Sequence, residues 1–433
     1  MRLALLCGAL ALLVAAQSAG AQDTTRGVRI GLTYTPGTKP GVVVLPIVGT
    51  AGDSVRAIIA RDFDHSDRIE VIGREGTTSF AAAQNAGSSV NYGLWKSLGA
   101  AAIVQGQITG GGLNVALHDV ARGRVIQVRD FTLPAGALNS EWRMAVHGVS
   151  DEIERWITGT RGIAQTRILY VRGGRVYVTD SDGHGERAIS EGGGALSPAW
   201  HPNGRMVAYS VFGSRGTEIM IHDLVDGRAR RSSATPGGLN ITPEFSPDGR
   251  SIAYAHGQES GTDLYLMDVA GVSGRRITVG RGTDNVSPSF SPDGRRIAFT
   301  SGRSGHPEVY TVDVDGTNAE LLTPFNFGDQ NYRSNPAWSP DGRLIAFQSQ
   351  IAGRFQIMTI NLRDRGIRQL TSDGRNEDAS WAPDSRHLVF TSNRSGTPQL
   401  FVLDVETGRT RQLTRTGGSR LAAWSRILPT AAP

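Results

Sequence analysis

The residues that could carry out chemistry are scattered along this chain of 433 residues. None of its nine histidines belongs to an HExxH pair or to a histidine–cysteine cluster, so their spacing predicts no zinc site. No serine has glycine both two residues before it and two residues after it, as the nucleophile elbow of a hydrolase requires. The GxxxxGK loop of nucleotide hydrolases is missing as well. The sequence therefore predicts a protein that is not an enzyme and that needs no cofactor.

One segment does have the ligand spacing of a calcium-binding loop. Asp180, Asp182 and Glu191 occupy positions one, three and twelve of that template, and Gly185 occupies position six. Position five is His184, however, and the flanking residues alternate as in strands, whereas the template is flanked by helices. We therefore interpret this segment as a turn between two strands, without a metal.

A repeat organises the second half of the chain. Segments such as SPSFSPDGRRIAFT, which starts at Ser287, recur so that an aromatic residue returns every 43 to 48 residues. In the copies that read SPDG the proline favours a turn, and the following Asp-Gly pair tolerates the tight turn positions. Repeats of this length with short alternating strands are typical of β-propeller blades. We interpret the aromatic residues as inter-blade core; they are Trp200, Phe245, Phe290, Trp338, Trp381 and Trp424.

The two ends of the repeat region predict how the ring closes. The last inner strand, residues 422–424, has no further strands after it, whereas three strand-like runs at 167–171, 175–179 and 187–190 precede the first repeat. Together they make one composite blade, which removes the open sheet edges of an unclosed ring. The sequence thus predicts an all-β six-bladed propeller closed by N- and C-terminal strands.

The part before the repeats has a different pattern. Strands are predicted at 42–47, 69–72, 101–108, 113–120 and 124–133, and helices at about 53–65, 90–98 and 140–157. This mixture predicts a small α/β domain. In the last helix the polar side, opposite the apolar stripe, carries Asp151, Glu152 and Arg155.

The N-terminus has the features of a secretory signal. Met1-Arg2 is followed by an apolar stretch at 3–16 and by Ala19-Gly20-Ala21, which predicts a signal peptide at 1–21. The α/β domain would then span 22–160 and the propeller 161–433. The single cysteine, Cys7, lies in the signal, which suits a mature chain in an oxidising compartment. No second apolar segment is long enough to predict a membrane span.

The formal net charge of +5 comes mainly from arginines. Many of them recur at one slot after each predicted turn, as Arg250, Arg295, Arg343 and Arg386 do. They are spread around the ring and form no stripe of basic and aromatic residues, so the pattern argues against nucleic acid as a partner.

Several segments match one known family in the order of that family. They are residues 40–46 (PGVVVLP), Trp95 with 98–100, 145–152 (AVHGVSDE), 157–159, 166–171 (TRILYV) and 423–425. In these segments the chain resembles the TolB family, the periplasmic propeller proteins with PD40/WD40-like repeats that belong to the Tol-Pal system. The resemblance covers essentially all of the chain after the signal.

The resemblance implies a monomeric, non-enzymatic periplasmic scaffold that acts in outer-membrane integrity and in invagination during cell division. It implies two partners, a peptidoglycan-associated lipoprotein (Pal) and a TolA-like inner-membrane protein. The family segment that engages TolA corresponds to Val28, Arg29 and Ile30. The family loops that contact the lipoprotein correspond to Leu239, Asn240, Ile241, Thr242, Asn285, Val286 and Ser287.

Two alternatives stay open at this point. The departures from the family pattern at residues 31–39 fit a TolB-like paralogue that binds another protein. A secreted propeller could also bind a small ligand such as a carbohydrate. Converging acids and histidines in register would favour that second alternative, and the sequence shows none.

Overall fold

The computed structural model describes residues 32, 38–73, 89–136, 138–214, 216–232, 237–271, 274–280, 283–323 and 332–428. The predicted signal peptide at 1–21 lies outside the described residues, as do Val28, Arg29 and Ile30. None of the helices within these ranges combines the length and the apolar character that a membrane span requires.

The first part of the chain forms one mixed five-stranded sheet with the order β2-β1-β3-β4-β5. Strand β1 pairs in parallel with β2 and β3, and β3, β4 and β5 pair antiparallel. The predicted strands are therefore present, with shifted ends. The strands are β1 (Gly41–Val44), β2 (Glu70–Val71), β3 (Ala100–Thr109), β4 (Gly112–Asp119) and β5 (Arg124–Thr132).

Within the described ranges three helices accompany this sheet, and each lies where the sequence predicts one: α1 (Gly52–His65), α3 (Tyr92–Ser97) and α4 (Ser140–Thr158). Helix α4 begins at Asn139, whose side chain accepts a hydrogen bond from the Trp142 N–H at 2.8 Å, and it ends at Gly159, which has a φ of 80°. An N-cap asparagine and a left-handed C-cap glycine are favourable helix ends.

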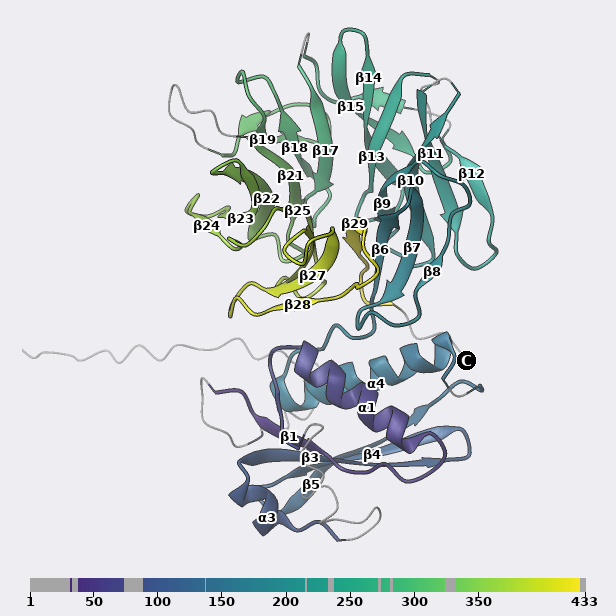
Figure 1. Ribbon diagram of the computed structural model, residues 1–433, viewed down its shortest axis with the longest axis vertical. Coiled ribbons are helices and arrows are strands. Elements are labelled where there is room, and N and C mark those ends of the chain that lie inside the picture. Colours follow the sequence, from purple (N-terminus) through teal and green to yellow (C-terminus); the bar gives the residue numbers. More distant parts are fainter. Residues whose placement is uncertain are drawn as a thin grey trace, which may run out of the picture.

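The predicted apolar stripe of α4 packs onto α1 and the sheet. Trp142, Val146, Val149 and Ile153 are buried there with Ile59 and Phe63 of α1. Figure 1 shows that α1 and α4 lie between the five-stranded sheet and the propeller. The opposite side of α4 is therefore also covered, which the sequence pattern alone does not reveal.

The rest of the chain forms six four-stranded antiparallel sheets, which are the blades of a propeller. Blade 2 comprises β9 (Ala195–Trp200), β10 (Met206–Gly213), β11 (Gly216–Asp223) and β12 (Ala229–Arg231). Blade 3 comprises β13 (Leu239–Phe245), β14 (Ser251–Gln258), β15 (Gly261–Asp268) and β16 (Gly274–Arg276). Blade 4 comprises β17 (Asn285–Phe290), β18 (Arg296–Ser301), β19 (Glu308–Asp313) and β20 (Glu320–Leu321). Blade 5 comprises β21 (Arg333–Trp338), β22 (Leu344–Ile351), β23 (Arg354–Asn361) and β24 (Ile367–Gln369); blade 6 comprises β25 (Asn376–Trp381), β26 (His387–Ser392), β27 (Gln399–Asp404) and β28 (Thr410–Gln412).

Blade 1 joins the two ends of the propeller, as the sequence predicts. Its inner strand β29 (Arg420–Trp424) pairs with β6 (Arg167–Arg172), with Trp424 opposite Ile168. The blade continues with β7 (Arg175–Asp180) and β8 (Arg187–Ala188). The predicted fold class, a small α/β domain followed by a six-bladed propeller closed by N- and C-terminal strands, is therefore confirmed.

The repeated aromatic residues lie between blades. Phe245, Phe290, Trp381 and Trp424 are buried, whereas Trp200 and Trp338 are half-buried. The Trp200 indole N–H donates to the Ala423 carbonyl of the previous blade at 3.1 Å, and the Trp381 indole donates to Ala337 in the same way at 2.9 Å. Trp200 and Trp381 therefore combine packing between blades with a hydrogen bond to the previous blade.

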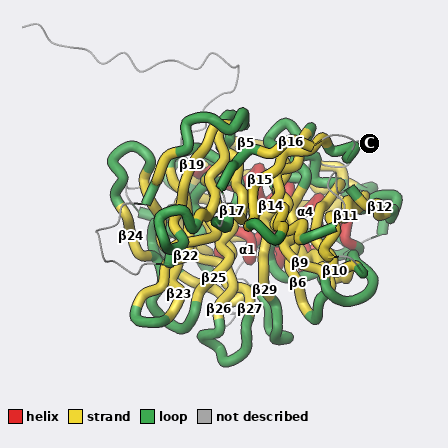
Figure 2. Tube along the Cα trace, turned by 90° about the horizontal axis from the view of Figure 1, so that it is seen from above, coloured by secondary structure: helices red, strands yellow, loops and turns green. Residues whose placement is uncertain are grey.

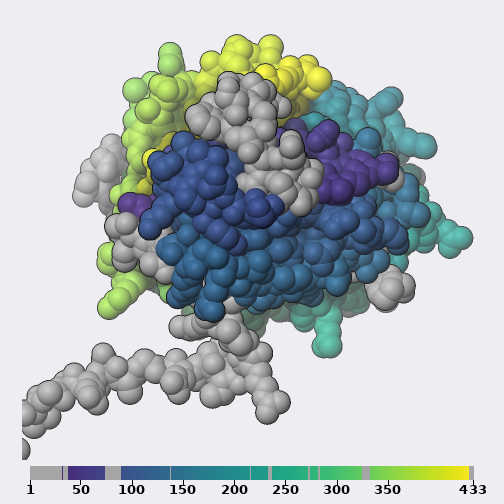
Figure 3. Space-filling view, turned by 90° about the horizontal axis from the view of Figure 1, so that it is seen from below, coloured from purple at the N-terminus to yellow at the C-terminus, as the bar shows by residue number. Residues whose placement is uncertain are grey.

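The direction of the inner strands defines two faces of the propeller. Residues that follow the inner strand β25, such as His387, contact the small domain, so the inner strands end at the face on that side. We call this the proximal face, and we call the opposite face, where the inner strands begin, the distal face. In Figure 2, the view from above, the propeller strands surround the centre and α1 and α4 lie beneath them. Figure 3, from below, shows the small domain in front of the propeller, whose blades extend beyond its outline.

Candidate functional site

Each inner strand is interrupted at the same position by a β-bulge. In four blades a proline follows the bulged residue, and proline has no N–H to donate to the neighbouring strand. The residue at this position has a left-handed φ between 48° and 55° in every blade. Because all six blades share it, this conformation belongs to the repeat and does not by itself mark a functional site. The six residues are Ser197, Thr242, Ser287, Asn335, Asp378 and Leu421.

The predicted lipoprotein-contact residues lie at the distal ends of two neighbouring inner strands. The sequence suggested loops here, but the structure places them inside β13 and β17. Asn240 and Asn285 are completely buried. Their amide groups donate to backbone carbonyls of the previous blade, Thr217 at 2.9 Å and Thr262 at 3.2 Å. These two asparagines therefore hold adjacent blades together and do not reach the surface.

The other five predicted residues are at least partly accessible. Leu239 is exposed, and Ile241, Thr242, Val286 and Ser287 are half-buried. Contact between these residues and a partner stays a prediction. Their position on one face of two adjacent blades is what such a contact requires.

The residue just before each bulge shows how the distal face is divided. In blades 2, 3 and 4 this residue is Leu196, Ile241 or Val286. In blades 5, 6 and 1 it is Ser334, Glu377 or Arg420. At this position the inner strands are therefore apolar in blades 2 to 4 and polar in blades 5, 6 and 1, and we call the corresponding parts of the distal face its apolar half and its polar half. Protein-binding surfaces commonly combine an apolar centre with polar surroundings.

Large exposed apolar side chains are concentrated on the same face. Among the described residues ten such side chains are exposed, and five of them lie at distal strand ends or in the connections between blades. Exposed apolar groups that gather on one face are a feature of interaction surfaces. The five are Phe212, Leu239, Val279, Tyr332 and Ile351.

The bulged residues themselves are linked from blade to blade. Thr242 Oγ1 accepts from the Ser287 N–H at 3.2 Å, and the Ser287 hydroxyl lies 2.9 Å from Asn335 Oδ1. The Asn335 amide in turn donates to Asp378 at 2.8 Å. This hydrogen-bonded arc runs across blades 3 to 6, so a change at Thr242 or Ser287 affects a connected set of inner strands.

Two carboxyl groups of the inner strands have raised pKa values. Burial raises the pKa of Asp378 to about 6, and the neighbouring Glu377 adds to the effect. Burial likewise raises the pKa of Glu244 to about 7. Glu244 occupies a slot where the other blades have alanine or serine. The inner strands of this propeller therefore carry less negative charge near neutral pH than their sequence suggests.

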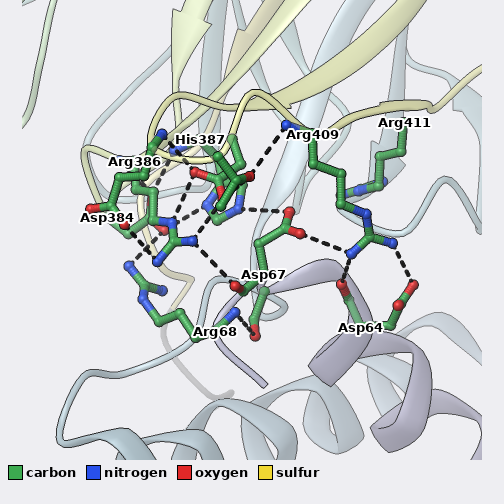
Figure 4. A network of polar contacts seen from close by, with 12 residues as sticks. Asp64, Asp67, Arg68, Asp384, Arg386, His387, Arg409 and Arg411 are labelled. Carbon is green, nitrogen blue, oxygen red and sulfur yellow. Dashed lines mark hydrogen bonds and ion pairs between the residues drawn. The ribbon is translucent and has the colours of Figure 1, made fainter. Parts of the chain in front are cut away.

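The proximal face holds the small domain through a dense polar network (Figure 4). Asp67 accepts from Arg409 at 2.8 Å and lies 3.5 Å from His387 Nε2. Arg68 bridges the two domains, since it contacts Glu154 of α4 at 3.3 Å and Asp384 of blade 6 at 3.1 Å. Blade 6 is therefore fixed to the segment between α1 and β2.

A second network joins blade 1 to the helices. Asp182, in the turn between β7 and β8, accepts from Arg61 of α1 at 3.0 Å and from Arg143 of α4 at 2.7 Å. His147 is buried beside it and bonds Asp62 through Nδ1 at 2.8 Å. The calcium-like spacing of this segment thus forms a blade turn that binds the small domain.

These networks include two groups of side chains with metal-ligand atoms within 4.8 Å of one another. In both groups arginines already bind the carboxylates, as Arg143 binds Asp182 and Arg386 binds Asp404. Burial lowers the pKa of His147, but Asp62 and Asp182 more than offset this and raise it to about 9. A metal ligand must be a neutral imidazole, so we interpret both groups as ion-pair networks. The groups are Asp67, His387 and Asp404, and His147, Asp180 and Asp182.

Sequence reasoning missed the interface residues of α4. His147, Asp151 and Glu154 are buried on the polar side of that helix, under the propeller. The Asp151 carboxyl accepts from the backbone N–H groups of Ala164 and Gln165, and burial raises its pKa to about 8. The signal that could have identified them is the spacing of His147, Asp151 and Glu154, which are four and then three positions apart and so share one helix face.

We expect the interface to weaken as the pH rises from 7 to 10. A group with a raised pKa stabilises the folded state below its unfolded pKa, and this contribution is lost as the pH rises through the folded value. His147, at about 9 against its usual 6.5, and Asp151, at about 8 against 3.8, both act in this direction. Calorimetry should show the unfolding temperature falling by several degrees between pH 7 and pH 10, and falling less in His147→Gln. An equal fall in both proteins would contradict the assignment.

Comparisons with known proteins agree with this architecture. The sequence matches the family described as the TolB beta propeller domain over residues 154–335 and 325–427, and the TolB amino-terminal domain over residues 36–126. Among solved structures, TolB from Acinetobacter baumannii superposes with a TM-score of 0.77 at 24% identity, covering 90% of this chain and 97% of that one. At 24% identity the superposition shows that the two proteins share a fold, and no more.

Curated relatives give the same family. The Tol-Pal system protein TolB of Thioalkalivibrio sulfidiphilus is 37% identical over 163 residues, which are 34% of this chain and 36% of that protein. The Tol-Pal system protein TolB of Methylococcus capsulatus is 34% identical over 210 residues, which are 45% and 48% of the two chains. The chain thus spans less than half the length of these relatives. Since the propeller match alone covers more than half of the sequence, the chain belongs to the TolB family.

Proposed function

We propose that this protein is a non-enzymatic scaffold of a Tol-Pal system that works in the periplasm. In this proposal the distal face of the propeller binds a peptidoglycan-associated lipoprotein. The N-terminal segment with Val28, Arg29 and Ile30 engages a TolA-like inner-membrane protein. Membership of the TolB family and the names of the curated relatives support the system, and the predicted signal peptide supports the compartment.

The observation that carries the proposal is the apolar half of the distal face. Leu239 is 39% exposed and Phe212 is 62% exposed, and both lie at the distal strand ends of blades 2 and 3. The half-buried Ile241 and Val286 lie near the distal ends of the inner strands of blades 3 and 4. Exposed leucine and phenylalanine side chains gain free energy when a partner removes them from water, about 25 cal/mol for each Å² buried. This face points away from the small domain, so the small domain does not cover it.

The two faces also separate the two proposed partners. The proximal face is occupied by the small domain through the networks around Asp67 and Asp182. A lipoprotein on the distal face would therefore leave the small domain uncovered. A scaffold that links an outer-membrane lipoprotein to an inner-membrane protein needs two such separate sites.

Introducing a carboxylate into the apolar half is expected to weaken lipoprotein binding. In Leu239→Glu and Val286→Glu the new charge would lose its hydration at the contact without gaining a partner, and affinity should fall by at least about tenfold. Titration calorimetry with the purified periplasmic domain of the lipoprotein measures the effect, and thermal melts report folding.

Val225→Glu is the matched control for this test. Val225 is 67% exposed in the turn between β11 and β12, on the proximal side, so its replacement should leave the affinity unchanged. Unchanged affinity in both distal variants would remove these residues from the interface. It would favour the alternative of a TolB-like paralogue that binds a different protein.

A further inference from the structure

A pocket with an arginine-rich lining opens on the polar half of the distal face. It lies between blades 5 and 6 and has a volume of about 320 Å³. That volume is at the lower end of the range for sites that bind small groups, roughly 300 to 1,000 Å³. Four residues line it, and we call it the arginine pocket: Arg354, Gly374, Arg375 and Asn393.

Both guanidinium groups of the arginine pocket have N–H donors that can bind a ligand. Among the residues that the structure describes, Arg354 makes no side-chain hydrogen bond or ion pair. Arg375 uses one nitrogen, Nη2, to bond Glu377 at 2.7 Å, and its side chain is 53% exposed. A guanidinium has five N–H groups, so most of the donors of the pair are available. The lining itself contains no acidic residue.

The walls of the pocket are held in place from both blades. The Arg375 guanidinium lies 5.2 Å from the centre of the Phe355 ring, which in turn packs edge-on against Tyr332 at 5.2 Å. Asn393 Oδ1 accepts a hydrogen bond from the backbone N–H of Arg375 at 2.8 Å, and the backbone N–H of Asn393 donates to the Arg375 carbonyl at 3.2 Å. The Arg375 side of the pocket is therefore held in place and loses little conformational freedom on binding, whereas the exposed Arg354 side chain becomes ordered when it binds.

We propose that the arginine pocket receives a carboxylate from an acidic side chain of the protein that docks on the distal face. Arginine binds carboxylates through two parallel N–H donors, and such charge-assisted hydrogen bonds are stronger than neutral ones. This inference rests on the proposed function, because the occupant belongs to the lipoprotein partner. It adds a feature of the partner surface. That surface would present an apolar patch that contacts Leu239 and Val286 and an acidic residue that binds Arg354 and Arg375.

The chemistry also excludes a neutral apolar occupant. A buried apolar group would remove water from two guanidinium groups without replacing its hydrogen bonds, which is unfavourable. A carboxylate replaces those bonds and balances the charge of Arg354. Arg420, on the neighbouring blade 1, lies in the polar half of the face as well and adds to its positive charge.

The test uses the full mature protein and the purified periplasmic domain of the lipoprotein. Titration calorimetry at low and high salt should show Arg354→Ala binding about tenfold more weakly at low salt, with a smaller salt dependence than the unmutated protein. Arg343→Ala is the matched control, since Arg343 is on the same blade, is 82% exposed and lies on the proximal side. Its affinity should be unchanged.

A second probe, citrate, does not depend on the lipoprotein. Citrate presents carboxylates to the pocket, so it should raise the unfolding temperature of the unmutated protein above that in sodium chloride of equal ionic strength. The Arg354→Ala/Arg375→Ala double variant should lose this increase, and Arg343→Ala should keep it. Equal stabilisation of all three proteins would overturn carboxylate binding in the pocket.

The outcomes separate this inference from the proposed function. If the unmutated protein binds the lipoprotein and Arg354→Ala binds it equally well, the inference is wrong and the proposed function stands. If the unmutated protein does not bind the lipoprotein at all, the proposed function is wrong, and the occupant named here is wrong with it.

Discussion

Removal of residues 421–433 is expected to abolish the cooperative unfolding of the propeller. This deletion takes away nearly all of β29, the strand that closes the ring by pairing with β6. Trp424 is 6% exposed and its indole donates to Thr166 at 2.8 Å, while the Ala423 carbonyl accepts from Trp200 of blade 2. The truncated ring would expose the edge of β6 that β29 covers, and an open strand edge promotes aggregation. Calorimetry and size-exclusion chromatography should show a lost transition and high-mass species.

Two variants sharpen this test. Trp424→Ala keeps the backbone of β29 and removes only the packed ring, so it should cost about 3 to 5 kcal/mol of unfolding free energy. Deletion of 429–433 alone leaves every described residue in place and should not change the transition. A protein lacking 421–433 that melts at the normal temperature would show that β29 does not close the ring.

Replacement of Asp182 by alanine is the second change with a large expected effect. The side chain of Asp182 is only 1% exposed, and its carboxylate accepts from both Arg61 and Arg143 while facing the His147 imidazolium. Without it Arg61 loses its carboxylate partner, Arg143 keeps only the more distant contact with Asp180 at 3.9 Å, and the positive charge around His147 is less well balanced. Removing one partner of a buried ion pair costs about 3 to 5 kcal/mol. We expect calorimetry to show a transition at lower temperature, because blade 1 no longer holds α1 and α4.

The control for Asp182→Ala is the same replacement in an ion pair on the protein surface. Asp341 contacts Arg343 at 3.8 Å, and both side chains are exposed. Its replacement by alanine should change the unfolding free energy by less than about 1 kcal/mol. If the two variants lost the same amount of stability, the interface network would contribute no more than a surface pair.

The elements of this protein are predictable because their signals are local. The stripe of Trp142, Val146 and Ile153 fixes α4, and Asn139 and Gly159 mark its ends. The repeated turn and the aromatic residue set the blades, and the unpaired strand that ends at Trp424 shows how the ring closes. In each case the residues that carry the signal are close together in the sequence or recur at a fixed interval.

The candidate site is less predictable because its residues meet only after folding. Asn240 and Asn285 suggested a partner contact, yet their amides bond the previous blade. The same slot in blade 6 holds Asn376, so the repetition of asparagine in one slot was the available sign of a structural role. Arg354 and Arg375 form one pocket from two different blades, and nothing local in the sequence pairs them.

Hydrogen exchange of the mature protein, with and without the periplasmic domain of the lipoprotein, tests the central claim most directly. Binding at the distal face should slow exchange in peptides that cover 237–242 and 283–287 and in the turn around Arg354. Peptides that cover the proximal turn around Val225 should exchange as before. Protection confined to the small domain or to the proximal turns would contradict the account.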